Sequence, residues 1–121
     1  MPHLTIEFSS NLSAAITPAL LCAVNRALLG TGQFEEADIK SRALPFDCFV
    51  VGTKDSPRGF VAARLAMLSG RDADTKHDVA EALLAALESA ITTDGMELQI
   101  SVEIVDIDRE SYAKSVIRAK T

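Results

Sequence analysis

Residues 1–8 read MPHLTIEF, and this stretch decides how the rest of the chain is interpreted. Apolar side chains occupy alternate positions within it, at Leu4, Ile6 and Phe8, with polar residues between them. Such alternation is typical of a half-buried β-strand, because successive side chains of a strand point to opposite faces. The chain is therefore predicted to begin with a strand that places these three side chains against a core.

The next predicted element is a helix that begins near Thr17. Thr17 can act as an N-cap, and Pro18 suits the first helical position because that position does not need its N–H group. The apolar residues that follow recur at helical spacing and are Leu20, Leu21, Val24, Ala27 and Leu28. We therefore predict an amphipathic helix that Gly30 and Gly32 end.

Two more strands are predicted before the second helix. The first covers residues 39–44, and Pro45 after it indicates an edge strand, a bulge or a change of direction. Residues 46–51 are apolar enough to continue extended structure, and residues 52–59 have the composition of a turn or hairpin loop. Residues 60–68 are mostly apolar and are predicted to form the next strand.

A second helix is predicted over residues 74–92, with Asp72 or Asp74 as its N-cap. Its apolar stripe consists of Val79, Leu83, Leu87 and Ile91. This spacing places the four side chains on one side of a helix, which is expected to face the core.

The last part of the chain is predicted to form a strand and a tail. Asp94-Gly95 is expected to make a turn into a strand over residues 98–107. The inward side chains of this strand would be Ile100, Val102 and Ile104. Residues 108–121 are mixed in character, with a short helical turn or strand expected around Tyr112.

The order of these elements predicts an α+β fold built from two βαβ units. Each unit would join a parallel pair of strands through a helix, giving a four-stranded mixed sheet with two helices on one face. We expect one domain over residues 1–121, with pseudo-repeats at about 2–52 and 59–108 and a tail at 109–121. The strand at 60–68 looks too apolar for a solvated face. We therefore expect the second face of the sheet to pack on another subunit.

Composition and charge disfavour several classes of protein. The 121 residues are 48% hydrophobic and carry a net charge of −5, which suits a globular domain and opposes binding to nucleic acid. We see no apolar stretch long enough to span a membrane and no secretion signal, so we expect no membrane association and a cytoplasmic location. Cys22 and Cys48 are expected to be buried free thiols of a reducing compartment.

The second residue is the first candidate for chemistry. If Met1 is removed, Pro2 carries a secondary amine, a type of base that no side chain provides. An α-amino group has a pKa near ~8, and nearby cations or an apolar pocket lower this value, leaving a neutral base near neutral pH. Met-Pro is also a common way for a protein to start. Pro2 alone therefore does not indicate an active site, and other residues must form a pocket around it.

Several segments together carry a resemblance to a known family. In order, they are PHLTIEF at 2–8, DIKSRA at 38–43, FV at 60–61, SGR at 69–71 and SVEI at 101–104. With Met-Pro at the start, this combination resembles the tautomerase superfamily and, within it, the 5-carboxymethyl-2-hydroxymuconate Δ-isomerase family. The resemblance covers nearly the whole chain. It implies a homotrimer with a central barrel-like core of sheets, helices outside, and active sites near the subunit boundaries around each terminal proline.

The resemblance also implies a reaction. It is the keto–enol isomerisation of an unsaturated 2-hydroxy or 2-oxo polycarboxylate, such as 5-carboxymethyl-2-hydroxymuconate from aromatic (homoprotocatechuate) catabolism. Pro2 would be the general base and acid, moving a proton without a covalent intermediate. The resemblance implies no metal and no organic cofactor.

Three cations are candidates for binding the carboxylates of this substrate and stabilising the dienolate: Arg42, Arg71 and Lys40. Arg42 has a planar guanidinium that can donate two parallel hydrogen bonds to a carboxylate. Lys40 projects from the same face of the strand as Arg42. Arg71 lies at the turn before the second helix, where helix N–H groups favour anions. Family members commonly have Arg-Ser-Arg where this chain has Lys40-Ser41-Arg42, so one bidentate group is lost. Each cation could also be a solvated surface charge.

Other functions and other residues stay open at this point. A dehalogenase, hydratase or decarboxylase of the superfamily would use a cationic proline with a high pKa, and a non-catalytic trimeric binding protein could share the fold. An RNA-binding module is disfavoured by the net negative charge and because the strands carry no platform of basic and aromatic side chains. His3 is expected to point away from residue 2, and Arg64 could line the pocket or form an inter-subunit ion pair. Tyr112 and Lys114 could close the pocket of a neighbouring subunit.

Overall fold

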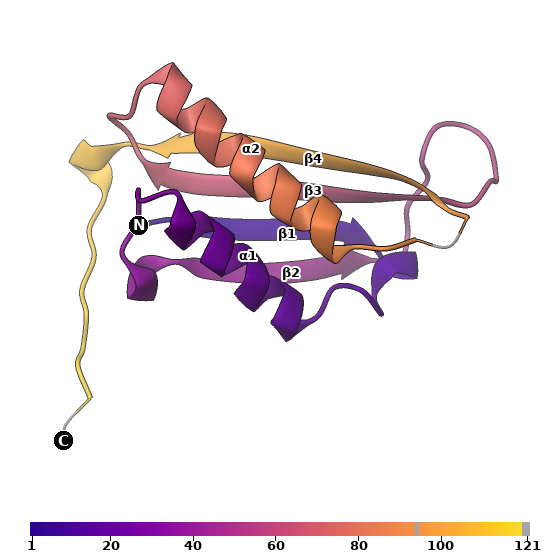
Figure 1. Ribbon diagram of the computed structural model, residues 1–121, viewed down its shortest axis with the longest axis horizontal. Helices are drawn as coiled ribbons and strands as arrows, with labels where there is room; N and C mark the ends of the chain where they lie inside the picture. The colour runs from indigo at the N-terminus through magenta and orange to yellow at the C-terminus, as the bar shows by residue number, and fades with distance from the viewer. Residues whose placement is uncertain (94, 120–121) are drawn as a thin grey trace.

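The computed structural model describes residues 1–93 and 95–119, and Figure 1 shows two helices on the same face of one sheet. The helices and strands are β1 (His3–Ser9), α1 (Pro18–Gly30), β2 (Lys40–Phe46), β3 (Arg58–Leu68), α2 (Ala73–Ala90) and β4 (Glu97–Ile107). Short 3-10 turns are η1 (Ser10–Leu12), η2 (Glu36–Asp38) and η3 (Arg109–Ser111). The strands lie in the order β2-β1-β3-β4 across the sheet.

Strand pairing confirms the predicted mixed sheet. β1 is parallel to β2, with Leu4 opposite Ser41, and antiparallel to β3, with Leu4 opposite Leu65. β3 is parallel to β4, with Leu65 opposite Ile104. One helix joins each parallel pair, α1 in the first unit and α2 in the second. The chain therefore has an α+β fold made of two βαβ units.

The core lies between the sheet and the two helices. Leu4, Ile6 and Leu65 on the central strands have no exposed surface. Burial of each such side chain contributes about 1.5–3 kcal/mol to folding. The helices supply buried residues from the predicted stripes, namely Leu20, Val24, Leu28, Val79, Leu83 and Leu87. The spacing of apolar residues thus identified the core correctly.

Both helices begin at predicted caps. The Thr17 hydroxyl accepts a hydrogen bond from the Leu20 N–H at 3.2 Å before α1. Before α2, the Asp72 carboxylate accepts one from the Thr75 N–H at 2.8 Å. Of the two candidate caps for α2, Asp72 is therefore the cap, and Asp74 lies within the first turn.

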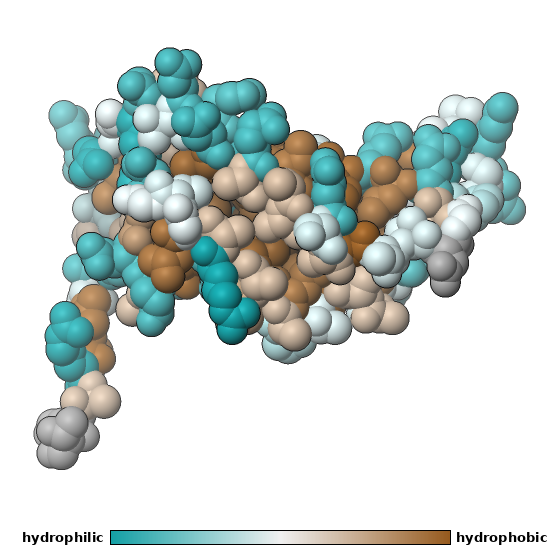
Figure 2. Space-filling view, viewed as in Figure 1, coloured by the Kyte–Doolittle hydropathy of each residue, from teal (hydrophilic) through white to brown (hydrophobic). Residues whose placement is uncertain are grey.

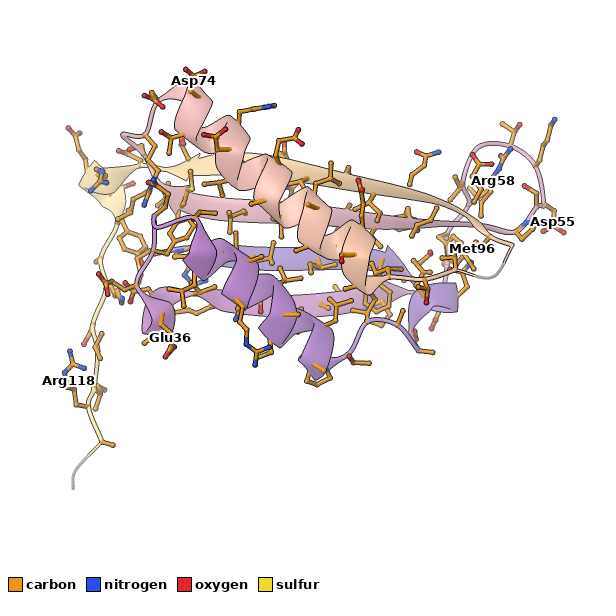
Figure 3. The ribbon with its side chains drawn as sticks, viewed as in Figure 1. Glu36, Asp55, Arg58, Asp74, Met96 and Arg118 are labelled. Atoms are coloured by element: carbon orange, nitrogen blue, oxygen red, sulfur yellow. The ribbon has the colours of Figure 1, made fainter. Side chains whose placement is uncertain are left out.

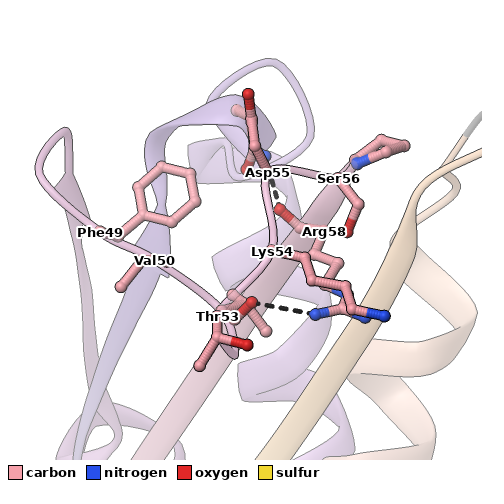
Figure 4. A pocket seen from close by; sticks show the side chains of 10 residues that line it. Phe49, Val50, Thr53, Lys54, Asp55, Ser56 and Arg58 are labelled. Carbon is pink, nitrogen blue, oxygen red and sulfur yellow. Dashed lines mark hydrogen bonds between the residues drawn. The ribbon is translucent and has the colours of Figure 1, made fainter.

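The connection from β2 to β3 differs from the prediction. Extended structure ends at Phe46 and does not continue to Val51, because residues 47–57 form a loop. This loop is not a hairpin, since β1 lies between β2 and β3 in the sheet. Arg58 Nη1 donates to the Val51 carbonyl at 3.2 Å, and the loop lines a cavity of about 480 Å³ (Figure 4). Pro45 lies on the edge strand β2, where a missing N–H is tolerated.

The face of the sheet opposite the helices, the open face, is more polar than expected. In β3, Val61, Leu65 and Met67 belong to the buried core. The large apolar side chains of this strand therefore lie mainly on the face that the helices cover. The open face carries Arg64, whose Nε lies 2.8 Å from Glu103 Oε1 on β4. The ion pair considered between subunits for Arg64 is therefore an ion pair within the chain.

The tail after β4 begins with η3, the short helical turn predicted near Tyr112. Residues 113–119 then continue without helix or strand and run past η2 (Figure 1). Residues 120–121, and Asp94 of the predicted Asp94-Gly95 turn, lie outside the described residues. Within the part of the chain that the structure describes, no helix is long and apolar enough to cross a membrane.

Candidate active site

Residue 2 lies at the end of the sheet where β1 and β2 begin, beside η2 and the tail (Figure 1). Pro2 is less than 2% exposed, and its carbonyl accepts a hydrogen bond from the Lys40 N–H at 3.2 Å. Because β1 and β2 are parallel and pair from His3 and Lys40 onward, their first residues lie side by side. The register of the opening strand thus sets residue 2 next to the start of β2.

Burial, together with three nearby cations, favours a neutral amine at the chain terminus. Burial holds the pKa of the Met1 amine below its usual range, and the positive charges of Arg71, Lys114 and Lys40 lower it further. Asp38 acts in the opposite direction and raises this pKa. These directions belong to the amine of Met1; Pro2, which removal of Met1 would make the terminal residue, lies next to it and is less than 2% exposed in the full chain.

Arg71 is fixed at the turn between β3 and α2. Gly70 before it has a φ of 119°, in a region that L-residues rarely adopt. Arg71 Nε and Nη2 donate to the side-chain and backbone oxygens of Gln33 at 3.1 and 2.9 Å, and Nη1 donates to the Leu68 carbonyl at 3.2 Å. The guanidinium also lies over the Phe34 ring, 5.1 Å from its centroid. A guanidinium has more N–H donors than these contacts use, so Arg71 can still bind a carboxylate.

Lys40, Asp38 and Lys114 form a second charged group at this end of the sheet. Lys40 Nζ donates to the Asp38 carbonyl at 2.7 Å and lies 3.8 Å from Met1 Sδ. Lys114 Nζ lies 2.6 Å from Asp38 Oδ1, and this hydrogen bond holds the pKa of the Asp38 carboxyl below its usual range. All three charged residues line a cavity of about 540 Å³ between η2 and the tail.

Arg42 lies apart from this group, on the open face. Its Nη2 is 3.1 Å from Nδ1 of His3. Burial and then the Arg42 guanidinium lower the pKa of His3, so the neutral ring is favoured and can accept a hydrogen bond. Among the described residues, the cations that act on the terminal amine therefore include Lys40 and Arg71 but not Arg42.

The arrangement suits proton transfer on an anionic substrate. A terminal amine with a lowered pKa is a base near neutral pH, and three cations near it outnumber one carboxylate. Such an excess of positive charge binds anions and stabilises negative charge that develops during a reaction. Over residues 1–93 and 95–119, no cluster of His, Cys, Asp and Glu side chains could hold a metal ion.

The sequence as a whole matches one protein family. The profile of the 5-carboxymethyl-2-hydroxymuconate isomerase family matches residues 2–121. The chain belongs to this family. The protein is thus an isomerase enzyme of the tautomerase superfamily, which confirms the family that the segments around Pro2 and Lys40 indicated.

Solved structures resemble this isomerase over most of its length. A 5-carboxymethyl-2-hydroxymuconate isomerase from Deinococcus radiodurans R1 is 29% identical, with a TM-score of 0.84 over 94% of this chain and 88% of that chain. A 5-carboxymethyl-2-hydroxymuconate delta-isomerase is 19% identical, with a TM-score of 0.73 over 96% and 88%. A fused 4-OT protein described as a symmetric trimer is 19% identical, with a TM-score of 0.74 over 93% and 91%. The last two show a shared fold. No protein with a curated description matches this chain.

Sequence reasoning missed part of the site in this isomerase. It gave Asp38 no role and named Lys114 only as a residue that could close the pocket of a neighbouring subunit. In the structure, the two residues contact each other within the chain across 76 positions. The tail has no periodic pattern that would have set its direction. A signal existed for Asp38, because it directly precedes the strand predicted to begin beside residue 2. The support of Arg71 by Gln33 joins segments 38 positions apart and was also missed.

Proposed function

We propose that this isomerase is a tautomerase in which removal of Met1 makes Pro2 the general base and acid. Its substrate is an unsaturated 2-hydroxy or 2-oxo polycarboxylate such as 5-carboxymethyl-2-hydroxymuconate. The observation that carries the proposal is the burial of residue 2 beside cations that lower the pKa of the neighbouring Met1 amine.

The proposed reaction moves one proton and needs no other reagent. In the ketonising direction, the proline nitrogen accepts the proton of the 2-hydroxy group. The electrons of that O–H bond form the 2-oxo group while the conjugated double bonds shift. The protonated proline then returns the proton to a carbon of the chain. Between these steps the substrate is a dienolate, and nearby cations stabilise its negative charge.

The three predicted cations have different parts in this proposal. Arg71 binds a carboxylate through its remaining donors, and Lys40 supplies a point charge beside the terminal amine. Arg42 lies on the open face, so we extend the proposal to a homotrimer in which Arg42 serves the site of an adjacent subunit. The shared fold of the trimeric fused 4-OT protein supports such an assembly.

The first prediction concerns Pro2→Ala. Removal of Met1 from this variant leaves a primary amine, so we expect kcat for ketonisation of phenylenolpyruvate and 2-hydroxymuconate to fall about 10²-fold without vanishing. Loss of the enol absorbance measures the rate. Equal rates for the wild type and the variant would disprove the role of Pro2.

Intact-mass spectrometry is the control for this experiment. Both proteins must lack Met1, since a retained methionine leaves an amide nitrogen at residue 2 in place of a base. A wild type that retains Met1 and is fully active would also contradict the mechanism.

A second candidate function uses a cationic proline, as in a dehalogenase, hydratase or decarboxylase of the superfamily. The cations Arg71, Lys114 and Lys40, which lower the pKa of the Met1 amine, would also oppose a positive charge on Pro2 and so favour the base over this acid. Direct titration of the amine separates the two, because a cationic proline needs a pKa above neutral pH.

A further inference from the structure

One ion pair joins the two sides of the cavity between η2 and the tail, which Lys40 also lines. Asp38 lies at the end of η2, and Lys114 lies on the tail, with 2.6 Å between Oδ1 and Nζ. Figure 3 labels Glu36 on η2 and Arg118 on the tail, which locates the two segments that line the cavity. The pair therefore ties the tail to the body at the proposed active site.

The tail around Lys114 has little packing of its own. Residues 113–119 form neither helix nor strand, and Val116 and Ile117 are 57% and 95% exposed. Figure 2 shows this segment standing away from the body, with hydrophobic surface in brown. A side chain on such a segment can exchange one partner for another without disturbing the core.

Lys114 already holds a carboxylate in the structure. The Lys114 and Asp38 side chains are 29% and 32% exposed, and ion pairs that water can reach contribute little net stability. A carboxylate of a bound molecule could therefore replace that of Asp38 on the Lys114 ammonium at small cost. The exchange keeps one charge-assisted hydrogen bond on Lys114.

We propose that Lys114 is a substrate-binding residue that selects dicarboxylates over monocarboxylates, and that Asp38 occupies its carboxylate position until the substrate binds. The inference rests on the proposed function of the same site. Arg71 takes one carboxylate, and Lys114 takes the second. A substrate with a single carboxylate uses Arg71 and leaves the ion pair of Lys114 in place.

The kinetic test uses Lys114→Gln with two substrates. For 2-hydroxymuconate, which has two carboxylates, KM should rise about 10-fold, as expected for the loss of one charged hydrogen bond. For phenylenolpyruvate, which has one, KM should stay within a factor of about two. Similar changes for both substrates, or no change for either, would overturn the inference.

Asp38→Asn gives a result of opposite sign. Without the competing carboxylate, KM for 2-hydroxymuconate should fall about 3-fold. If the ion pair served only to hold the tail against the body, Lys114→Gln and Asp38→Asn would both raise KM. A rise in KM for Asp38→Asn would therefore count against the exchange.

Lys76→Gln is the matched control. Lys76 forms an ion pair with Asp106 of β4 at 3.3 Å and with similar exposure of the lysine, and neither residue is among the described charges that shift the pKa of the terminal amine. The same substitution there should leave both KM values unchanged. A rise as large as that of Lys114→Gln would show a general effect of charge and overturn the inference.

A binding measurement separates this inference from the proposed reaction. By calorimetry, the wild type should bind hexanedioate more tightly than hexanoate, and Lys114→Gln should remove about 10-fold of that preference. An inactive wild type that still shows this dependence would refute the proposed function and leave the inference standing. Activity without any Lys114-dependent preference would refute the inference alone.

Discussion

At the scale of single residues, burial is the largest influence on the pKa of the Met1 amine, and charges of both signs modify it. Lys40, Lys114 and Arg71 lower its pKa after burial has done so, and Asp38 raises it. A catalytic base works best when its pKa lies near the working pH, because it must both take the proton and give it back. Asp38 therefore limits how far the cations weaken the base.

The pH dependence of kcat/KM should reveal these opposing charges. The rate should rise with pH as the amine loses its proton. Asp38→Asn removes the charge that raises the pKa of the amine, so it should move this rise to lower pH. Lys114→Gln removes a charge that lowers the pKa, so it should move the rise to higher pH. Profiles with phenylenolpyruvate measure both shifts, and shifts in one common direction would contradict the assignment.

Sequence reasoning named Lys40, Arg42 and Arg71 as candidates but did not show that the side chains of Lys40 and Arg42 end at different partners. Their spacing of two places both on the same face of β2. Lys40 starts the strand, however, and its long flexible chain reaches the Asp38 carbonyl, while Arg42 stays on the open face beside His3. Alternation along a strand predicts where a side chain leaves the backbone, but not where a long side chain ends.

At the scale of elements, periodicity predicted the strands and helices well. The strands were found from alternation and the helices from spacing together with the Thr17 and Asp72 caps. The failure at residues 47–51 has a physical cause. An apolar run indicates burial or extended structure, but a strand also needs a neighbouring strand to pair with. After β2, at the edge of the sheet, the chain crosses to the other side of β1, where β3 begins.

The Thr17 cap gives a prediction for stability. Thr17→Ala removes the acceptor for the Leu20 N–H at the start of α1, so the free energy of unfolding should fall by about 1 kcal/mol. The melting temperature should fall by about 4 °C. Denaturant unfolding at fixed protein concentration measures the change. Thr53→Ala in the exposed β2–β3 loop is the control, and an equal loss there would contradict the role of the cap.

At the scale of the whole molecule, the proposed homotrimer would assemble through the open face. Ala62 lies there on β3, directly opposite Glu7 of β1, and is half-buried. In a single subunit a larger polar side chain at this position can reach water. In the proposed homotrimer, the same side chain would be enclosed beside a like charge.

Ala62→Glu should therefore separate the subunits while each one stays folded. Light scattering should give the mass of a trimer for the wild type and of a monomer for the variant, with an unchanged circular dichroism spectrum. Ala85→Glu, on the exposed side of α2, should remain trimeric. A trimeric Ala62→Glu protein would contradict assembly through the open face.

Arg71 has a consequence for how ligands of this protein can be found. It lies in the second βαβ unit and donates to Gln33 in the first, so an acid bound there contacts a junction of both halves. Any ligand that binds only the folded chain adds to its stability, by about 2.7 kcal/mol at a concentration of 100 times its Kd. Ranking a panel of carboxylic acids by melting temperature would therefore point to the natural substrate before a turnover assay exists.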